Sequence, residues 1–303
     1  MPRILDYSIL DVFAERPLEG NPLAVFHDAR SLSDAEMQAL ARETNLSETT
    51  FIFPGDPETE AHGGVRVRIF TTQEELPFAG HPTLGTATWL YLNHPVLRGA
   101  SSITLRLNVG PITVRFEATE DGVPGVRATM AQNDPVFGAT HDRADVARAI
   151  GLNAEDLSAE YPPQTVSTGV PFCIVLLRSM EASQRLQLAP LEAQAWAAKN
   201  DAQIFYCIAP VVVKGEGGAD WHARMQFYAG EDPATGSAAG CCIAWLVKTK
   251  LVASGIYSMI EQGIEVQRPS RITAQARLEG DTVRSILVSG RTIPVANGRF
   301  FLP

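Results

Sequence analysis

The feature that most constrains this chain is an internal repeat. Segments of the first half recur in the same order in the second half of the 303 residues, at an offset of about 149 to 156. The matched segments are 21–26 with 170–175, 36–53 with 192–208, 68–70 with 224–226, and 78–90 with 233–246. Repetition at half the length of the chain predicts two similar domains related by a pseudo-twofold axis. Four matches in the same order disfavour the alternative, a chance similarity between ordinary apolar elements.

Two segments of the repeat, HPTLGTATWLYL (81–92) and GSAAGCCIAWLVKTK (236–250), are apolar on nearly every side. A helix with this pattern must be buried. Both segments are rich in Gly, Ala, Ser and Thr, which allow close packing of the backbone. Because strand-like segments dominate the rest of both halves, the sequence predicts sheets that wrap around a central helix.

The surrounding segments are read from their periodicity. Residues 33–45 predict an amphipathic surface helix, which Ser33 and Glu36 begin as a capping box. Its expected apolar side is Met37, Leu40 and Ala41. Residues 64–69 alternate apolar residues with arginines, and residues 102–130 predict an antiparallel meander. At the start of the chain we expect Leu5, Tyr7 and Ile9 to share one face of a strand.

Composition and charge exclude several classes of function. Apolar residues make up 45% and charged residues 19% of the chain, which excludes a disordered protein. The net charge is −9 and Lys and Arg form no cluster, so we expect no nucleic-acid partner. The chain has neither a signal-peptide pattern nor an apolar run of ~18 residues. We therefore expect no membrane partner and a cytoplasmic location.

The cysteines and the short motifs argue against cofactor chemistry. Cys173, Cys207, Cys241 and Cys242 all lie in apolar runs, where we expect buried free thiols. The chain has no C-x-x-C pair, G-x-G-x-x-G, P-loop or H-E-x-x-H motif. We predict neither a metal nor a cofactor.

Three unusual clusters could carry chemistry: NLSETT (45–50), PFAGHPT (77–83) and GEDPATGS (230–237). The last two immediately precede the two predicted buried helices. The N-terminus of a helix has unpaired N–H groups and a partial positive charge, and it binds carboxylates and phosphates. Two equivalent helix starts in a repeated chain favour an anion site in an interdomain cleft over simple helix caps.

Individual residues in these clusters have both a functional and a structural interpretation. Glu48, partly removed from water at the start of a strand, suits a general acid or base, but alone it could be a surface carboxylate. Asp232 could act in catalysis or cap the second buried helix. His81 could donate a hydrogen bond to a substrate or serve a structural role, and Ser237 could also donate. Ser237 does not lie in a G-x-S-x-G elbow, so a serine hydrolase is disfavoured.

Taken together, the segments GNPLAVF, NLSETTFIF, RIFTTQEELPFAGHPTLGTA and GEDPATGSAAG resemble the PhzF phenazine-biosynthesis family, which has the diaminopimelate epimerase fold. The resemblance spans about residues 7 to 245. It implies an α/β (α+β) protein of two pseudo-symmetric domains, each a curved, mostly antiparallel sheet around a central helix. We place the domains at residues 1–133, completed by a C-terminal strand at about 293–303, and at residues 134–292.

The resemblance also implies a cofactor-independent isomerase that acts on a small carboxylate-bearing metabolite in the interdomain cleft, commonly as a homodimer. In diaminopimelate epimerase two cysteines are the acid and base. Gly80 and Thr235 stand at the matching positions here, which excludes two-thiol racemisation. In the PhzF-like branch the acid and base is instead the glutamate of the S-E-T motif, here Glu48, assisted by Asp232 and His81.

The resemblance further implies substrate contacts from Gly80, Thr83, Gly236 and Ser237. The family activity is named after one substrate, trans-2,3-dihydro-3-hydroxyanthranilate. The alternative function is a non-catalytic protein that binds small carboxylates on the same scaffold.

Overall fold

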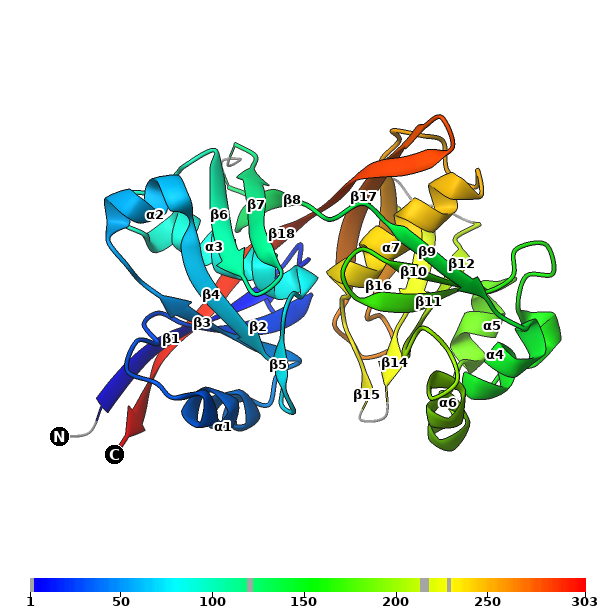
Figure 1. Ribbon diagram of the computed structural model, residues 1–303, viewed down its shortest axis with the longest axis horizontal. Coiled ribbons are helices and arrows are strands. Elements are labelled where there is room, and N and C mark those ends of the chain that lie inside the picture. The colour runs from blue at the N-terminus through cyan, green and yellow to red at the C-terminus, as the bar shows by residue number, and fades with distance from the viewer. Residues whose placement is uncertain (1–2, 119–121, 213–217, 228–229) are drawn as a thin grey trace. The chain divides into compact units, whose positions relative to one another are not determined.

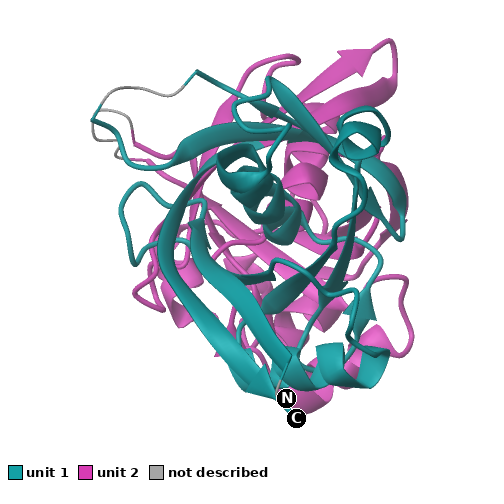
Figure 2. Cartoon of the chain, turned by 90° about the vertical axis from the view of Figure 1, so that its left-hand side faces the viewer, with its two compact units in different colours: residues 1–131, 289–303 teal, residues 132–288 magenta. Residues whose placement is uncertain are grey.

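The computed structural model describes residues 3–118, 122–212, 218–227 and 230–303. Its internal contacts divide the chain into two compact units, residues 1–131 with 289–303 (unit 1) and residues 132–288 (unit 2). Figure 2 shows unit 1 in teal and unit 2 in magenta. Unit 1 contains both ends of the chain, because the last strand continues from unit 2 into unit 1. The domain bounds given above stay a prediction.

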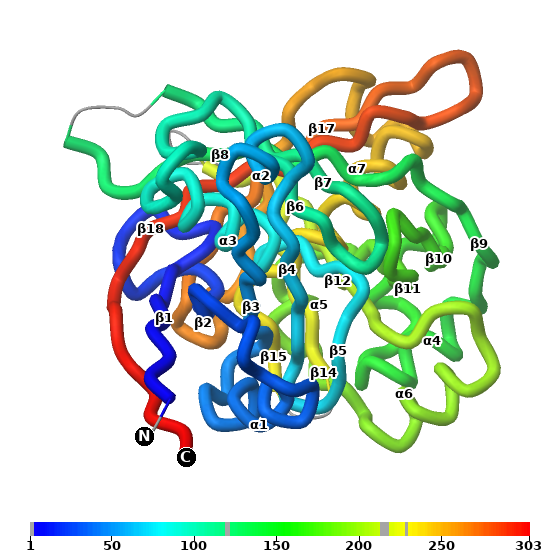
Figure 3. The backbone as a smooth tube through the Cα atoms, turned by 60° about the vertical axis from the view of Figure 1, so that its left-hand side comes forward, coloured from blue at the N-terminus to red at the C-terminus, as the bar shows by residue number. Residues whose placement is uncertain are grey.

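The strands of unit 1 form a closed sheet. Their order is β1-β2-β3-β4-β6-β7-β8-β18, and β1 also pairs antiparallel with β18, from Arg3 opposite Leu302 to Val12 opposite Thr292. Figures 1 and 3 show these two strands side by side. The elements are β1 (Arg3–Val12), β2 (Asn21–Phe26), α1 (Asp34–Thr44), β3 (Glu48–Phe53), α2 (Pro57–Gly63), β4 (Val65–Phe70), β5 (Glu75–Leu76), α3 (Gly80–Asn93), β6 (Ser102–Leu107), β7 (Gly110–Phe116), β8 (Val126–Ala131) and β18 (Thr282–Leu302), which begins in unit 2.

The strands of unit 2 follow the order β18-β17-β16-β13-β12-β11-β10-β9, and β14 pairs separately with β15. The remaining elements are β9 (Val136–Thr140), α4 (Arg143–Ala149), the 3₁₀ turn η1 (Ala154–Asp156), β10 (Gln164–Ser167), β11 (Pro171–Leu176), α5 (Met180–Arg185), α6 (Pro190–Ala197), β12 (Ile204–Pro210), β13 (Trp221–Arg224), β14 (Gln226–Phe227), β15 (Gly230–Glu231), α7 (Gly236–Lys248), β16 (Ser258–Gln262) and β17 (Ser270–Glu279).

The two units repeat one topology. The order β1-β2-β3-β4-β6-β7-β8 in unit 1 corresponds to β10-β11-β12-β13-β16-β17-β18 in unit 2. Strand directions agree as well: in both series the second strand is parallel to the third and the fourth to the fifth. The first and second, third and fourth, and fifth and sixth strands are antiparallel in both. The predicted internal duplication is therefore present in the fold.

Each unit contains the buried helix that the sequence predicts. Helix α3 contacts β1, β2, β3, β6, β7 and β8 of unit 1, and α7 contacts β10, β11 and β17 of unit 2. Every residue of α3 from Gly80 to Thr88 is buried, as is every residue of α7 up to Val247. Small residues permit this packing: a Cβ atom at Gly85 would come within 2.5 Å of the Leu23 side chain. The prediction of curved, mostly antiparallel sheets around central helices is confirmed.

The local expectations for α1, the cysteines and β1 are confirmed. Helix α1 begins with the Ser33–Glu36 capping box, and its buried residues are those expected. The four cysteines are buried and free. In β1, Leu5, Tyr7 and Ile9 precede the register shift between Ile9 and Leu10, so they share one face as expected, and Tyr7 packs in the same apolar cluster as Leu5. Among the described residues, no helix has the length and apolarity needed to cross a membrane.

Candidate active site

Glu48 is placed by the turn between α1 and β3. Asn45 ends α1 in the left-handed conformation (φ 51°), so the chain reverses and Glu48 starts β3 beside Leu23 of the parallel strand β2. Alternate residues of a strand point the same way, so Glu48 lies on the same face of β3 as Thr50. The hydroxyl of Thr86 on α3 donates a hydrogen bond to Thr50 Oγ1 at 2.8 Å. Glu48 is thus on the face of β3 that packs against the central helix.

The side chain of His81 reaches this glutamate from the first turn of α3. His81 Nδ1 lies 3.5 Å from Glu48 Oε2, and the two side chains are 4% and 16% exposed. The amide nitrogen of Asn21 lies 3.3 Å from the same Nδ1. Burial lowers the pKa of His81 to about 3, so the imidazole is neutral near pH 7. Within the described residues, His81 Nε2 has no hydrogen-bond partner, which leaves it available to a ligand.

The start of α3 has the features of an anion site. In the described structure, the N-cap residue Ala79 provides no side-chain cap, and Pro82 has no N–H. The N–H groups of Gly80 and His81 are the first two of the helix and lie at its positive end. The hydroxyl of Thr83 donates to the Ala79 carbonyl at 2.7 Å, so its lone pairs rather than its proton would meet a ligand.

The start of α7 in unit 2 is similar. Thr235 is the N-cap, and in the described structure its side chain does not cap the helix. Gly236 and Ser237 follow as buried first-turn residues. Asp232 is only 6% exposed, and its Oδ2 accepts a hydrogen bond from the Thr235 hydroxyl at 2.6 Å. Asp232 is therefore tied to the N-cap residue of the second buried helix.

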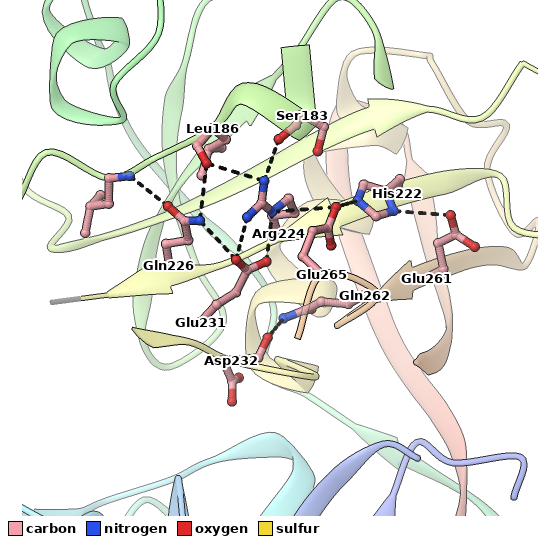
Figure 4. Close-up of polar contacts among 11 residues, drawn as sticks. Ser183, Leu186, His222, Arg224, Gln226, Glu231, Asp232, Glu261, Gln262 and Glu265 are labelled. Carbon is pink, nitrogen blue, oxygen red and sulfur yellow. Dashed lines mark hydrogen bonds and ion pairs between the residues drawn. The ribbon is translucent and has the colours of Figure 1, made fainter. Parts of the chain in front are cut away.

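An ion pair leads into each buried helix, at the same position of the repeat. In unit 1, Arg68 on β4 donates to both carboxylate oxygens of Glu75 on β5, at 2.7 and 2.5 Å. In unit 2, Arg224 on β13 donates to both oxygens of Glu231 on β15, at 2.8 and 2.6 Å. Figure 4 shows the unit 2 pair with Asp232 directly after Glu231. Each pair holds the chain at its glutamate, five residues before the helix begins. That glutamate is the first residue of E-L-P-F-A-G-H in unit 1 and of E-D-P-A-T-G-S in unit 2.

The structure thus gathers the predicted residues into two groups, each within its own unit. Glu48, Gly80, His81 and Thr83 lie at the start of α3, and Asp232, Gly236 and Ser237 lie at the start of α7. Their catalytic and binding roles stay predictions.

Other parts of the described chain offer less chemistry. No group of three His, Cys, Asp or Glu side chains among the described residues is arranged to hold a metal ion. Among the described residues, two surface depressions of about 570 and 390 Å³ lie in unit 2. One lies along residues 151–156 and 184–187, and the other along 210–211, 220–221, 251–253 and 256–258. Neither is lined by the predicted site residues.

Comparison with known proteins decides the family. The family model PhzC-PhzF, of phenazine biosynthesis-like proteins, matches residues 10–298. The chain belongs to the PhzC-PhzF family. A family relative in Pseudomonas aeruginosa, named trans-2,3-dihydro-3-hydroxyanthranilate isomerase, is 34% identical over 98% of this chain and 99% of its own. An uncharacterized isomerase of Mesorhizobium japonicum is also 34% identical, with the same coverage.

Solved structures of related proteins have the same fold. A predicted epimerase of Pseudomonas aeruginosa matches with a TM-score of 0.81 and 39% identity over 98% of this chain and 99% of that one. A PhzF-family protein of Bacillus anthracis matches with a TM-score of 0.85 and 24% identity over the same shares of the two chains. A hydroxyproline epimerase of Agrobacterium vitis, at 11% identity and a TM-score of 0.63 over 99% and 91%, shares the fold alone. The resemblance and the reaction class, an isomerase, are confirmed.

Sequence reasoning missed three residues that contact the predicted site residues or lie beside them. Asn21 lies in the quoted GNPLAVF motif, which was the available signal for it. Arg224 was matched with Arg68 through segments 224–226 and 68–70, but neither arginine was assigned to the site. Gln262, which binds both Asp232 and Thr235, gave no signal, because only the pairing of β13 with β16 brings it there.

Proposed function

We propose that this chain is a cofactor-independent isomerase that moves a proton between two carbon atoms of a small carboxylate-bearing metabolite. The observation that carries the proposal is the pairing of Glu48 with a neutral His81 at the start of a buried helix. A largely buried carboxyl next to an anion-binding helix end suits proton transfer on a carboxylate substrate.

The reaction balances within the substrate. The Glu48 carboxylate takes a proton from a substrate carbon, the C–H bond breaks, and its electron pair moves into the adjacent conjugated bonds. Protonated Glu48 then returns the proton to another carbon, where a new C–H bond forms. Nothing is oxidised or reduced and no group leaves, so the chemistry needs no co-reactant. One carboxyl can serve as both base and acid if the site excludes water.

The other predicted residues hold and assist the substrate in this proposal. The N–H groups at the starts of α3 and α7, from Gly80 and Gly236, bind its carboxylate. The Ser237 hydroxyl donates to the substrate, the Thr83 hydroxyl accepts from a donor group of the substrate, and His81 contributes Nε2. Asp232 assists the proton transfer. If both units serve one substrate, as the sequence predicts, variants of Glu48 and of Asp232 both lower kcat.

A relative's name supplies the first compound to test. Because the Pseudomonas aeruginosa relative is named for trans-2,3-dihydro-3-hydroxyanthranilate, we propose that compound, or another small unsaturated carboxylate, as substrate. The second candidate function is a non-catalytic carboxylate-binding protein, which the uncapped helix starts alone would support. The Glu48–His81 pair favours catalysis, since binding at the helix ends does not require it.

Isotope exchange tests the proposal. The protein is incubated in D2O with trans-2,3-dihydro-3-hydroxyanthranilate and with a panel of small carboxylates chosen by thermal shift. Proton NMR should show deuterium at the new C–H position, diluted by protium carried internally from the substrate. EDTA should not change the rate. Binding without any exchange of a carbon-bound proton would support the binding protein instead, and turnover that EDTA abolishes would refute the proposed chemistry.

The expected homodimer and the cytoplasmic location stay predictions. Sedimentation velocity of the full chain at micromolar concentration measures the first, and cell fractionation measures the second.

A further inference from the structure

Gln262, the last residue of β16, is fully buried beside the start of α7 and uses both ends of its amide. Its Oε1 accepts hydrogen bonds from the backbone N–H of Thr235 and from the Tyr206 hydroxyl, both at 3.1 Å. Its Nε2 donates to the carbonyl oxygen of Asp232 at 2.8 Å and to Thr235 Oγ1 at 2.9 Å. One side chain therefore joins the backbone on both sides of the Asp232–Thr235 turn.

The donors and acceptors in this cluster can be arranged in one way. A backbone N–H only donates, so the amide oxygen of Gln262 must face Thr235 N and the amide nitrogen must face Thr235 Oγ1. Since Thr235 Oγ1 accepts from Gln262, its proton is directed to Asp232 Oδ2, 2.6 Å away. The chain of hydrogen bonds thus runs from Gln262 through Thr235 to the Asp232 carboxylate. Figure 4 shows Gln262 and Asp232 from this cluster.

The same fold is built in unit 1 without these polar groups. Counted from the equivalent Arg–Glu pairs, Leu76 and Ala79 occupy the positions of Asp232 and Thr235. The equivalent of Gln262 follows from the strand pairings. In unit 1, Val65 of β4 pairs with Leu105 of β6, and in unit 2 the equivalent Trp221 of β13 pairs with Ile260 of β16. Leu107, two residues after Leu105, therefore occupies the position of Gln262. Leu107 and Ala79 are buried, as their counterparts are.

This internal comparison separates fold from function. A buried polar group costs free energy unless it is hydrogen-bonded, and apolar residues of similar shape can replace a buried polar cluster with little loss of stability. In unit 1 the same turn and buried helix form with Leu76, Ala79 and Leu107 at these three positions. The Asp232–Thr235–Gln262 cluster is therefore not required by the fold that both units share.

We propose that Gln262 and Thr235 are positioning residues that set the orientation of the Asp232 carboxylate at the start of α7. Gln262 holds the Thr235 hydroxyl, and that hydroxyl holds the carboxylate. The inference rests on the proposed role of Asp232 in catalysis, but the orientation of its side chain can be tested separately.

The first test is structural and needs no substrate. Crystal structures are compared for the wild type, Thr235→Val, Thr235→Ser and the double variant Gln262→Leu/Thr235→Ala, which takes its residues from unit 1. We expect the Asp232 carboxylate to leave its wild-type rotamer in Thr235→Val and in the double variant, and to keep it in Thr235→Ser. An unchanged carboxylate in both Thr235→Val and the double variant would overturn the proposal.

The second test is kinetic, with trans-2,3-dihydro-3-hydroxyanthranilate as substrate. We expect Thr235→Val and the double variant to lose kcat by about 10- to 100-fold with KM nearly unchanged, since misplacing a group by about 1 Å can cost as much as 10²-fold. Thr235→Ser should restore kcat to within about twofold of the wild type, a rescue that a purely structural role would not predict. Tyr206→Phe is the matched control: it removes a contact of Gln262 but not of Thr235, so kcat should stay near wild type.

Asp232→Asn separates the two proposals. If Asp232→Asn keeps full activity, Asp232 has no catalytic role and that part of the proposed function fails, while the crystal structures still decide the positioning. If Asp232→Asn is inactive and Thr235→Val has wild-type kcat, the positioning proposal fails and the proposed function stands. If the compound is not turned over, the structural test alone decides.

Discussion

Nδ1 of His81 and Oε2 of Glu48 lie 3.5 Å apart, although Glu48 begins β3 and His81 lies in the first turn of α3. The helix supplies the imidazole and the strand supplies the carboxyl, and both side chains are largely removed from water. This pair is the structural basis of the proposed proton transfer.

Replacing Glu48 by Gln should abolish most turnover. The substitution keeps the shape of the side chain but removes the group that carries the proton. We expect kcat to fall by about 10² to 10⁴, the usual worth of general acid–base catalysis, with ligand affinity largely kept. Steady-state kinetics and isothermal titration measure the two quantities. A variant that retains a third of wild-type kcat would show that another residue moves the proton.

His81 should make the protein less stable in acid. Burial lowers the pKa of His81 to about 3, whereas an unfolded histidine titrates near 6.5. Between these values the unfolded state binds the extra proton, so stability falls as pH falls below about 6.5. Urea unfolding of wild type and His81→Gln from pH 4 to 7 measures this. The variant should lose less stability than the wild type, by about 1 kcal/mol per pH unit. Parallel curves would show that His81 does not control this loss.

His222 should have the opposite effect at alkaline pH. Its Nδ1 lies 3.2 Å from Glu261 Oε1 and its Nε2 lies 2.9 Å from Glu265 Oε1. Figure 4 shows His222 between the two glutamates. Burial alone would lower the pKa of His222, but hydrogen bonds and charges of the two glutamates raise it to about 9. Because the folded-state pKa lies above the unfolded value near 6.5, this stabilisation is complete below pH 6.5 and is lost as pH rises through 9.

The expected loss for His222 is on the order of 3 kcal/mol of unfolding free energy. Denaturant unfolding between pH 6 and 10 should show it in the wild type and not in His222→Gln. The NMR titration of the His222 ring provides an independent reading. A midpoint at or below 6.5 would contradict the prediction.

The two equivalent ion pairs should differ in their contribution to stability. Arg224 and Glu231 are 6% and 7% exposed, whereas Arg68 and Glu75 are 17% and 25% exposed. Arg224→Met leaves a buried carboxylate without its main partner and should cost about 3 to 5 kcal/mol. Arg68→Met should cost less, since Glu75 is nearer to water. Each glutamate keeps one amide hydrogen bond, from Asn108 to Glu75 and from Gln226 to Glu231, so exposure is the difference. Chemical denaturation of both variants measures the difference, and equal losses would contradict the role assigned to burial.

The four thiols should not react in the native protein. Cys173, Cys207, Cys241 and Cys242 are buried, and burial raises the pKa of each thiol, that of Cys241 to about 11. Since the thiolate is the reactive form, iodoacetamide should leave activity intact. Mass spectrometry after native and denatured alkylation measures the labelling. Rapid inactivation that substrate prevents would place a cysteine in the active site.

Much of the architecture could be predicted from short-range patterns. The segments 81–92 and 236–250 are apolar on all sides, and such a helix must be surrounded by protein. Ser33 and Glu36 are close enough in sequence to begin a helix by themselves. The repeated order of segments gave the duplicated topology, because similar sequences fold alike. The Glu48 and Asp232 motifs were recognised because each is a compact local run.

Tertiary structure decided the contacts between distant residues. The pairing of Glu48 with His81 depends on how β3 packs against α3, and the cluster around Asp232 depends on the register of β16 beside β13. Local sequence determines which elements form and where they begin. The residues that meet across strands are decided only when the sheet closes around its helix, since a shift of one residue in register turns every side chain to the opposite face.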